Sequence, residues 1–153
     1  MNNNKVLIID DDDDYRTSIR TLLESHNYNV NEASSGKEGL EKLKQEKPDL
    51  IVLDIMMETI DQGYSLNQII KFQKQYQDYK NVPILMVSSI DEDPFTRFAH
   101  AGGQVEMIIP DQYMTKPVDI PKFLELVNKL ISVCPEIGYF SQIFKPIFDR
   151  NVQ

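Results

Sequence analysis

Acidic side chains follow two apolar segments of this chain, at the point where each segment ends. Asp10 and Asp11 come directly after the apolar residues 6–9, and Asp54 comes directly after residues 50–53. Continuous apolar runs are typical of buried parallel strands, whose carboxyl ends meet at one edge of a sheet. Carboxylates gathered at that edge could hold a divalent cation, because Mg²⁺ binds one or two carboxylates together with phosphate oxygens. The sequence therefore predicts a site for a cation and a phosphoryl group.

A hydroxyl group and an amine follow two further apolar segments. Ser88 comes after residues 84–87, and Lys116 comes after residues 113–115 and before Pro117. Taken one at a time, such residues are ordinary turn or surface positions. Their order at the ends of successive strands favours a phosphorylation site, because phosphoryl transfer depends on neutralising charge on the phosphoryl oxygens.

Strand-like and helix-like segments alternate along the chain. Expected strands cover residues 5–9, 28–32, 49–53, 82–87 and 112–115, and expected helices cover residues 15–25, 35–47, 64–76, 93–102 and 119–132. This alternation predicts right-handed crossovers and a doubly wound α/β fold, with a five-stranded parallel sheet covered by helices on both faces. Asp13 or Asp14 is expected to cap the first helix, since a carboxylate there accepts free backbone amides.

Length, charge and composition exclude several classes of protein. The chain has 153 residues, a formal net charge of -8 and 41% hydrophobic residues, as in one ordinary globular domain. Such a charge repels nucleic acid and anionic membranes. The apolar runs are too short to cross a bilayer, and the first residues lack the layout of a signal peptide. We therefore expect a cytoplasmic protein with no direct nucleic-acid partner and no membrane contact. Cys134 is the only cysteine, which excludes an internal disulfide.

The ordered combination of these motifs resembles the signature of response-regulator receiver domains from two-component signalling. The resemblance covers residues 5–132 and implies the flavodoxin-like strand order 2-1-3-4-5. It also implies that a sensor histidine kinase donates a phosphoryl group from a phosphohistidine, with the receiver catalysing its own modification. The phosphorylated receiver would then act on a downstream effector, or pass the group to a histidine phosphotransfer protein, and homodimerisation is a further expectation.

The resemblance assigns roles to the acidic residues by position. Asp54 matches the phosphoacceptor, and Asp11 matches the direct ligand of Mg²⁺. Asp10 would act mostly through a metal-bound water. The backbone carbonyl of Met56 would complete the coordination that the protein supplies.

Three further residues match family positions around the phosphoryl group. Lys116 would pair with that group, and the hydroxyl of Ser88 would reach its oxygens. Tyr113 would switch between outward and inward rotamers. The peptide bond between Lys116 and Pro117 is expected to be cis, a geometry realistic only before proline.

Two apolar residues are expected to lengthen the lifetime of the phosphorylated form. Met56 and Ile90 lie two residues beyond the expected phosphoacceptor and hydroxyl, where family members vary. Neither side chain can orient an attacking water, so the slow dephosphorylation that the receiver catalyses should be slower than in fast chemotaxis-type receivers.

The chain departs from the family pattern in three places. Glu58 replaces the usual proline, residues 61–63 contain one residue more than the usual Asp-Gly, and the segment 102–113 is longer than usual. We hypothesise that residues 105–109 form a docking surface, the alternative being a longer loop.

We assign residues 1–133 to the receiver and residues 134–153 to a C-terminal extension, which packs on the domain as a short helix or contacts a partner.

Two competing hypotheses assign other functions to the same residues. A haloacid-dehalogenase-like phosphatase also needs a strand-end aspartate, Mg²⁺, a hydroxyl and a lysine, but nothing after Pro117 supplies its further acidic motif. A pseudo-receiver would keep the fold and use it as an interaction module without phosphorylation. The intact acidic residues, Ser88 and Lys116 favour a working receiver.

Overall fold

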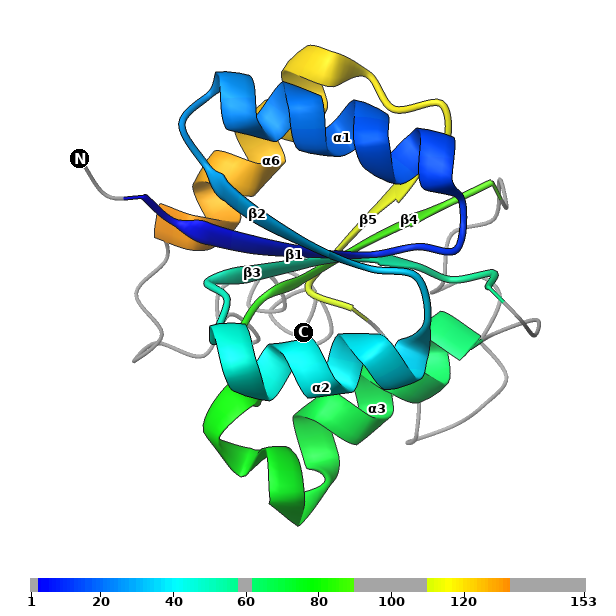
Figure 1. Ribbon diagram of the computed structural model, residues 1–153, viewed down its shortest axis with the longest axis vertical. Coiled ribbons are helices and arrows are strands. Elements are labelled where there is room, and N and C mark those ends of the chain that lie inside the picture. Colours follow the sequence, from blue (N-terminus) through cyan, green and yellow to red (C-terminus); the bar gives the residue numbers. More distant parts are fainter. Residues whose placement is uncertain (1–2, 58–61, 90–109, 133–153) are drawn as a thin grey trace, which may run out of the picture.

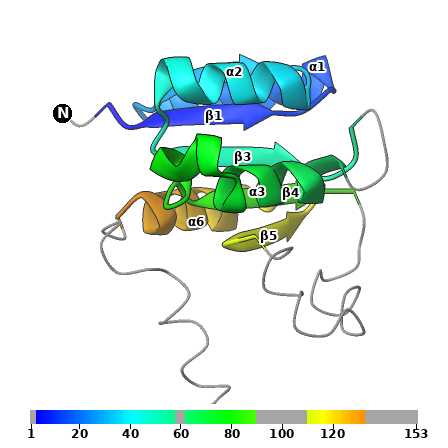
Figure 2. The same ribbon diagram turned by 90° about the horizontal axis from the view of Figure 1, so that it is seen from below.

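Among the described residues, five parallel strands form one sheet in the centre of the molecule (Figures 1 and 2). The computed structural model describes residues 3–57, 62–89 and 110–132. The strands are β1 (Lys5–Ile9), β2 (Asn29–Ala33), β3 (Leu50–Asp54), β4 (Ile84–Ser88) and β5 (Gln112–Thr115). Their order in the sheet, β2-β1-β3-β4-β5, confirms the predicted fold class and strand order.

Helices cover both faces of this sheet, as the alternation of segments predicts. They are α1 (Asp13–Ser25), α2 (Gly36–Glu46), α3 (Gln62–Phe72), the 3-10 helix η1 (Lys74–Tyr79) and α6 (Ile120–Ser132). In Figure 1, α1 and α6 lie on one face, and α2 and α3 lie on the other. Within β1, Val6 and Ile8 pack toward α1 and α6, while Leu7 and Ile9 pack toward α2 and α3. Both faces of the strand are therefore buried, which explains its continuous apolar sequence.

The strand register brings the ends of the strands to a common edge. Ile9 at the end of β1 lies opposite Leu53, so Asp10 and Asp54 come next along neighbouring strands. Asp54 itself pairs with Val87, the residue before Ser88. Neighbouring strands are about 4.8 Å apart, and the register therefore places these polar residues side by side.

Helix capping differs from the prediction at α1 and explains where α6 begins. Asp12, rather than Asp13 or Asp14, caps α1, because its side chain accepts hydrogen bonds from the backbone N–H groups of Asp14 and Tyr15. The prediction of Asp13 or Asp14 as the cap was wrong by one or two positions within a run of identical residues.

At α6, Oδ1 of Asp119 accepts a hydrogen bond of 2.9 Å from the backbone N–H of Lys122, so the helix begins at Ile120.

The third helix is shorter than predicted and starts earlier. We expected one helix over residues 64–76, but α3 spans Gln62–Phe72 and a separate 3-10 helix follows. Gln73 has an extended backbone, with φ -76° and ψ 133°, which interrupts the helical hydrogen bonding. The strands β1 and β5 have the predicted bounds, and the other described elements differ from theirs by one or two residues.

Several predictions fall on residues outside the described part of the chain. They are the helix at 93–102, the docking surface at 105–109 and the extension at 134–153, with Glu58, Ile90 and Cys134. Of the described helices, none is long and apolar enough to cross a membrane.

Gly63 allows the start of α3 to pack on the end of β3. Its backbone N–H donates a hydrogen bond of 2.9 Å to the carbonyl oxygen of Ile55. A Cβ atom at position 63 would overlap the carbonyl oxygen of Asp54 and lie 2.6 Å from Cα of Ile55. Only glycine therefore fits against the backbone that carries Asp54.

We expect Gly63→Ala to lower the free energy of unfolding by about 2 kcal/mol, because backbone atoms must move to admit the methyl group. Gly36→Ala is the matched control, since its Cβ would have ordinary contacts, at 3.5 Å from Nε2 of Gln62. That variant should be unchanged or up to about 1 kcal/mol more stable. Urea unfolding measures both, and equal stability of the two variants would contradict the packing argument.

Candidate functional site

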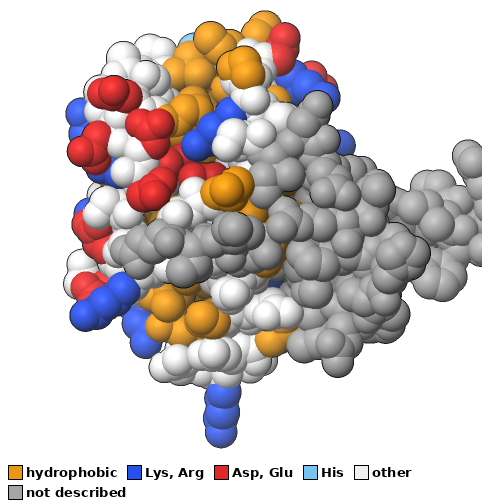
Figure 3. Space-filling model, turned by 90° about the vertical axis from the view of Figure 1, so that its right-hand side faces the viewer, with side chains coloured by type: hydrophobic (Ala, Val, Ile, Leu, Met, Phe, Trp, Pro, Cys, Tyr) orange, Lys and Arg blue, Asp and Glu red, His pale blue; other side chains and the backbone are white. Residues whose placement is uncertain are grey.

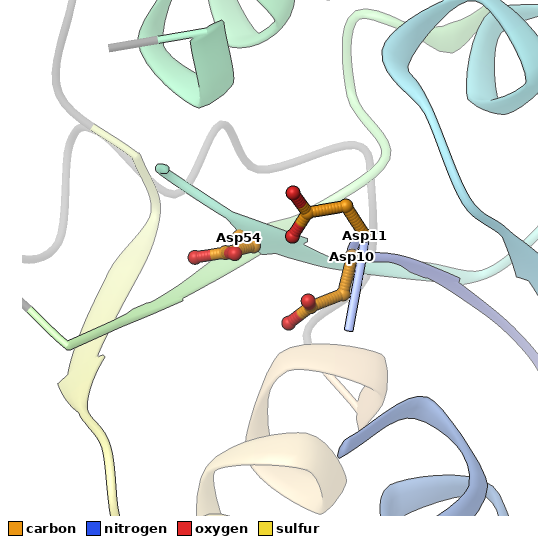
Figure 4. A group of neighbouring side chains, drawn as sticks. All are labelled: Asp10, Asp11 and Asp54. Carbon is orange, nitrogen blue, oxygen red and sulfur yellow. The ribbon is translucent and has the colours of Figure 1, made fainter. Parts of the chain in front are cut away.

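Three carboxylates from two neighbouring strands form a cluster at the edge of the sheet (Figure 4). One oxygen from each of Asp10, Asp11 and Asp54 lies within 4.8 Å of the others. Asp10 is 2% exposed and Asp54 is 6% exposed, whereas Asp11 is exposed to solvent. The structure thus brings together the three acidic residues that the sequence singled out.

Lys116 completes the cluster from the end of β5, directly after Thr115 and two strands away from Asp54. Its Nζ lies 2.6 Å from Oδ2 of Asp10 and 3.7 Å from Oδ2 of Asp54. The backbone fixes this placement, because the N–H of Lys116 donates a hydrogen bond of 2.7 Å to the carbonyl oxygen of Ser88. The peptide bond from Lys116 to Pro117 is cis, as the family resemblance implies. One ammonium group therefore contacts two buried carboxylates.

Both oxygens of Asp10 already accept hydrogen bonds within the protein. Oδ1 accepts from the backbone N–H of Asp12 at 2.9 Å, and Oδ2 accepts from Lys116. The carbonyl oxygen of Asp10 accepts from Arg16 at 2.6 Å. Asp10 is thus held on all its oxygens, while the neighbouring Asp11 extends into solvent, which fits an indirect role for Asp10 and a direct one for Asp11.

Burial gives Asp54 an unusual protonation equilibrium. Loss of hydration, followed by the charge of Asp10, raises the pKa of Asp54 to about 7, although Lys116 and a hydrogen bond from the backbone N–H of Met56 act in the opposite direction. Like charges at such close range repel, and a cation that neutralises them would favour the ionised carboxylate. The site therefore has a deficit of positive charge beside Asp54.

The donor set of this cluster fits Mg²⁺. Its ligand atoms are hard carboxylate oxygens, two of them on buried residues and one on a solvent-exposed residue that leaves room for metal-bound water. Mg²⁺ prefers such oxygens and keeps several waters. Asp10, Asp11 and Asp54 would hold the ion, with the carbonyl of Met56 as the expected fourth group.

The remaining predicted residues lie around the cluster at different depths. Ser88 is fully buried at the end of β4, one residue beyond the partner of Asp54 in the sheet. Met56 is 38% exposed, and its backbone N–H lies 3.3 Å from Oδ1 of Asp54. Tyr113 is half-buried within β5, opposite Met86, and packs against the core on the side of α2 and α3. The hydroxyl role of Ser88 and the switching role of Tyr113 stay predictions.

Two residues of α1 belong to this neighbourhood although sequence reasoning gave them no role. The ring centroid of Tyr15 lies 3.9 Å from Nζ of Lys116. Arg16 holds the carbonyl of Asp10 and also pairs with Asp13 and Glu32. The spacing of Tyr15 to Ile19 in the apolar stripe of the helix was the available signal, since residues four apart share a helix face.

Exposed acidic residues surround the buried cluster. Residues 11–14 are all exposed, and acidic side chains gather on the face of the molecule at which β1 and β3 end (Figure 3). The negative field of this face favours a divalent cation and opposes a free phosphate. A phosphoryl group would therefore need a cation or an ammonium group to approach Asp54.

Comparison with known proteins identifies the family of this arrangement. The model of the response regulator receiver domain family matches residues 6–128. The chain belongs to this family. Solved receiver domains have the same fold: that of Francisella response regulator 1452 is 31% identical, with a TM-score of 0.68, and the match covers 84% of this chain and 97% of that one. The receiver domain of Klebsiella pneumoniae RstA, activated by BeF₃, is 26% identical with a TM-score of 0.68, over 84% of this chain and 99% of that one.

A curated relative of this receiver domain is a longer protein. The alkaline phosphatase synthesis transcriptional regulatory protein PhoP of Bacillus subtilis is 39% identical over 115 residues, which are 75% of this chain and 43% of PhoP. The chain therefore spans less than half the length of PhoP.

The raised pKa of Asp54 predicts a pH-dependent stability without metal. Between the ordinary carboxyl pKa and about 7, the unfolded chain has lost a proton that the folded protein keeps, so this group lowers the stability of the fold as pH rises through that window. Asp54→Asn should unfold like the wild type near pH 4 and be more stable by roughly 4 kcal/mol near pH 8.

Urea unfolding at a series of pH values measures this difference. Saturating Mg²⁺ should stabilise the wild type and leave the variant nearly unchanged, because the ion compensates the charge that the variant lacks. A difference between the two proteins that stays constant with pH would contradict the assignment.

Proposed function

We propose that this receiver domain accepts a phosphoryl group on Asp54 from the phosphohistidine of a sensor histidine kinase, with Mg²⁺ as cofactor. The observation that carries the proposal is the contact of Lys116 with two buried carboxylates beside an exposed third one. Buried acidic residues lower the stability of the fold unless an ammonium group or a cation neutralises their charges. Membership of the receiver family supports the same chemistry.

Each residue of the cluster would have a different role in phosphoryl transfer. The ionised carboxylate of Asp54 attacks phosphorus, an O–P bond forms, and the N–P bond of the phosphohistidine breaks with its electron pair returning to the imidazole. Lys116, which already lies 3.7 Å from Asp54, pairs with a phosphoryl oxygen. Bound Mg²⁺ supplies neutralisation of the charge on the phosphoryl oxygens. The hydroxyl of Ser88 donates to a further oxygen.

The phosphorylated domain would signal through altered protein contacts. Pairing of Lys116 with the phosphoryl group withdraws the ammonium from Asp10, which changes the interactions at the ends of β1 and β5. We assign the receiver to residues 1–133 and give it a cytoplasmic location, consistent with a kinase donor and a protein target. The target is a downstream effector, and homodimerisation on phosphorylation is part of the same proposal.

Labelling with radioactive acetyl phosphate tests the acceptor directly. The wild-type protein with Mg²⁺ should take up about one acid-stable, base-labile phosphoryl group per chain, as an acyl phosphate does. Asp54→Asn should abolish labelling. Lys116→Ala should slow it by about 100-fold, because a charge-assisted contact to the phosphoryl group is lost.

The control and the contrary outcome use other carboxylates of the same run. Asp14→Asn changes an exposed residue outside the cluster and should label like the wild type. Continuous release of phosphate that Asp10→Asn abolishes, without labelling of Asp54, would instead indicate a phosphatase. Absence of both Mg²⁺ binding and labelling would indicate a pseudo-receiver.

We propose a long lifetime for the phosphorylated form, because the side chain of Met56 beside Asp54 cannot orient a water molecule. After removal of the donor, label should be lost slowly with Mg²⁺ present. Met56→Asn places a polar group at this exposed position and should accelerate the loss several-fold. Phe72→Asn, which changes an exposed residue at the end of α3, is the control. Rapid loss of label from the wild type would refute the proposal.

A further inference from the structure

Tyr15 lies beside the proposed phosphorylation site, and its hydroxyl group makes no hydrogen bond to the described residues. The hydroxyl oxygen of Tyr15 is buried and has no hydrogen-bond partner among the described residues. Such an atom is rare in folded proteins, because leaving a buried donor unpaired costs about 1–3 kcal/mol. The position of the ring indicates where a partner would come from.

The ring of Tyr15 lies beside Lys116, the same residue whose ammonium group contacts Asp54. Nζ of Lys116 lies 3.9 Å from the ring centroid and 3.7 Å from Oδ2 of Asp54, so the ring and the phosphoacceptor both adjoin one ammonium group. Burial, then the charges of Asp10 and Asp54, raise the pKa of Tyr15 above its ordinary value. The phenol therefore stays protonated, as a donor, within the field of both carboxylates.

We propose that the hydroxyl of Tyr15 donates a hydrogen bond to a phosphoryl oxygen on Asp54, while its ring holds the ammonium of Lys116 in position. A phosphoryl group brings strong acceptor oxygens into a site where Asp54 alone offers two, one of which faces the backbone N–H of Met56. The aromatic face attracts the ammonium that the phosphoryl group also needs. The inference rests on the proposed phosphorylation of Asp54.

Titration calorimetry with beryllofluoride, in saturating Mg²⁺, tests this role on the full chain. Beryllofluoride mimics the phosphoryl group, and it activates the related receiver domain of RstA. Tyr15→Phe keeps the ring and removes only the hydroxyl, and should weaken beryllofluoride binding about tenfold, as expected for a lost hydrogen bond to a charged group. Tyr15→Leu also removes the aromatic face and should weaken binding further.

Two further measurements separate this role from simple packing. The affinity for Mg²⁺ without beryllofluoride should be unchanged in Tyr15→Phe, since Tyr15 is not one of the acidic ligands. Its unfolding temperature should be equal or higher, because an unpaired buried hydroxyl is gone. Tyr28→Phe, at a half-buried tyrosine in the same core, is the control and should bind beryllofluoride like the wild type.

The contrary results are distinct from a failure of the proposed function. Equal beryllofluoride affinity of wild type and Tyr15→Phe would overturn the role of the hydroxyl. Equal affinity of Tyr15→Phe and Tyr15→Leu would overturn the role of the ring. If the wild type itself bound no beryllofluoride, the assignment of Asp54 as phosphoacceptor would fail first.

Discussion

The contact of one ammonium group with two buried carboxylates is the interaction on which this site depends. Asp10 and Asp54 are almost completely buried on adjacent strands, and Lys116 contacts both of them. Without it, two like charges would share a site of low polarity, and breaking such a buried pair typically costs about 3–5 kcal/mol. Even with it, the pKa of Asp54 is raised to about 7. The arrangement is poor for stability and suited to a site that receives a cation and then a phosphoryl group.

The parallel sheet explains how residues so distant in sequence meet with such definite geometry. Helices cover both faces, so each central strand is held by its packing on two sides and its end cannot slip. Gly63 lets α3 approach the backbone that carries Asp54, and the carbonyl of Ser88 holds the backbone of Lys116. The chemistry thus rests on strand ends and backbone hydrogen bonds, which position side chains more closely than isolated loops do.

The sheet and the cluster could be predicted from the sequence because each depends on a strong local pattern. Continuous apolar runs mark β1, β3 and β4, and the residue after each run is polar, so Asp10, Asp54 and Ser88 follow directly. The cap of α1 could not be chosen in this way. Five consecutive aspartates have the same intrinsic preference, and only the path of the backbone after β1 selects Asp12.

Long-range contacts were the other limit of prediction. Tyr15 meets Lys116 only because the backbone from β5 to α6 returns beside α1, and no local pattern in either segment records that path. The break between α3 and η1 is similar, since residues 64–76 keep a helical apolar spacing through Gln73 although its backbone is extended. Neither feature is recorded in the local sequence pattern.

A crystal structure of the protein with Mg²⁺ and beryllofluoride tests the central claim most directly. The account predicts one beryllofluoride group on a carboxylate oxygen of Asp54, with Nζ of Lys116 in contact with a fluorine and a metal ion bound by Asp11 and Asp54. An empty Asp54, or a metal ion held elsewhere while Lys116 stays paired with Asp10, would contradict it.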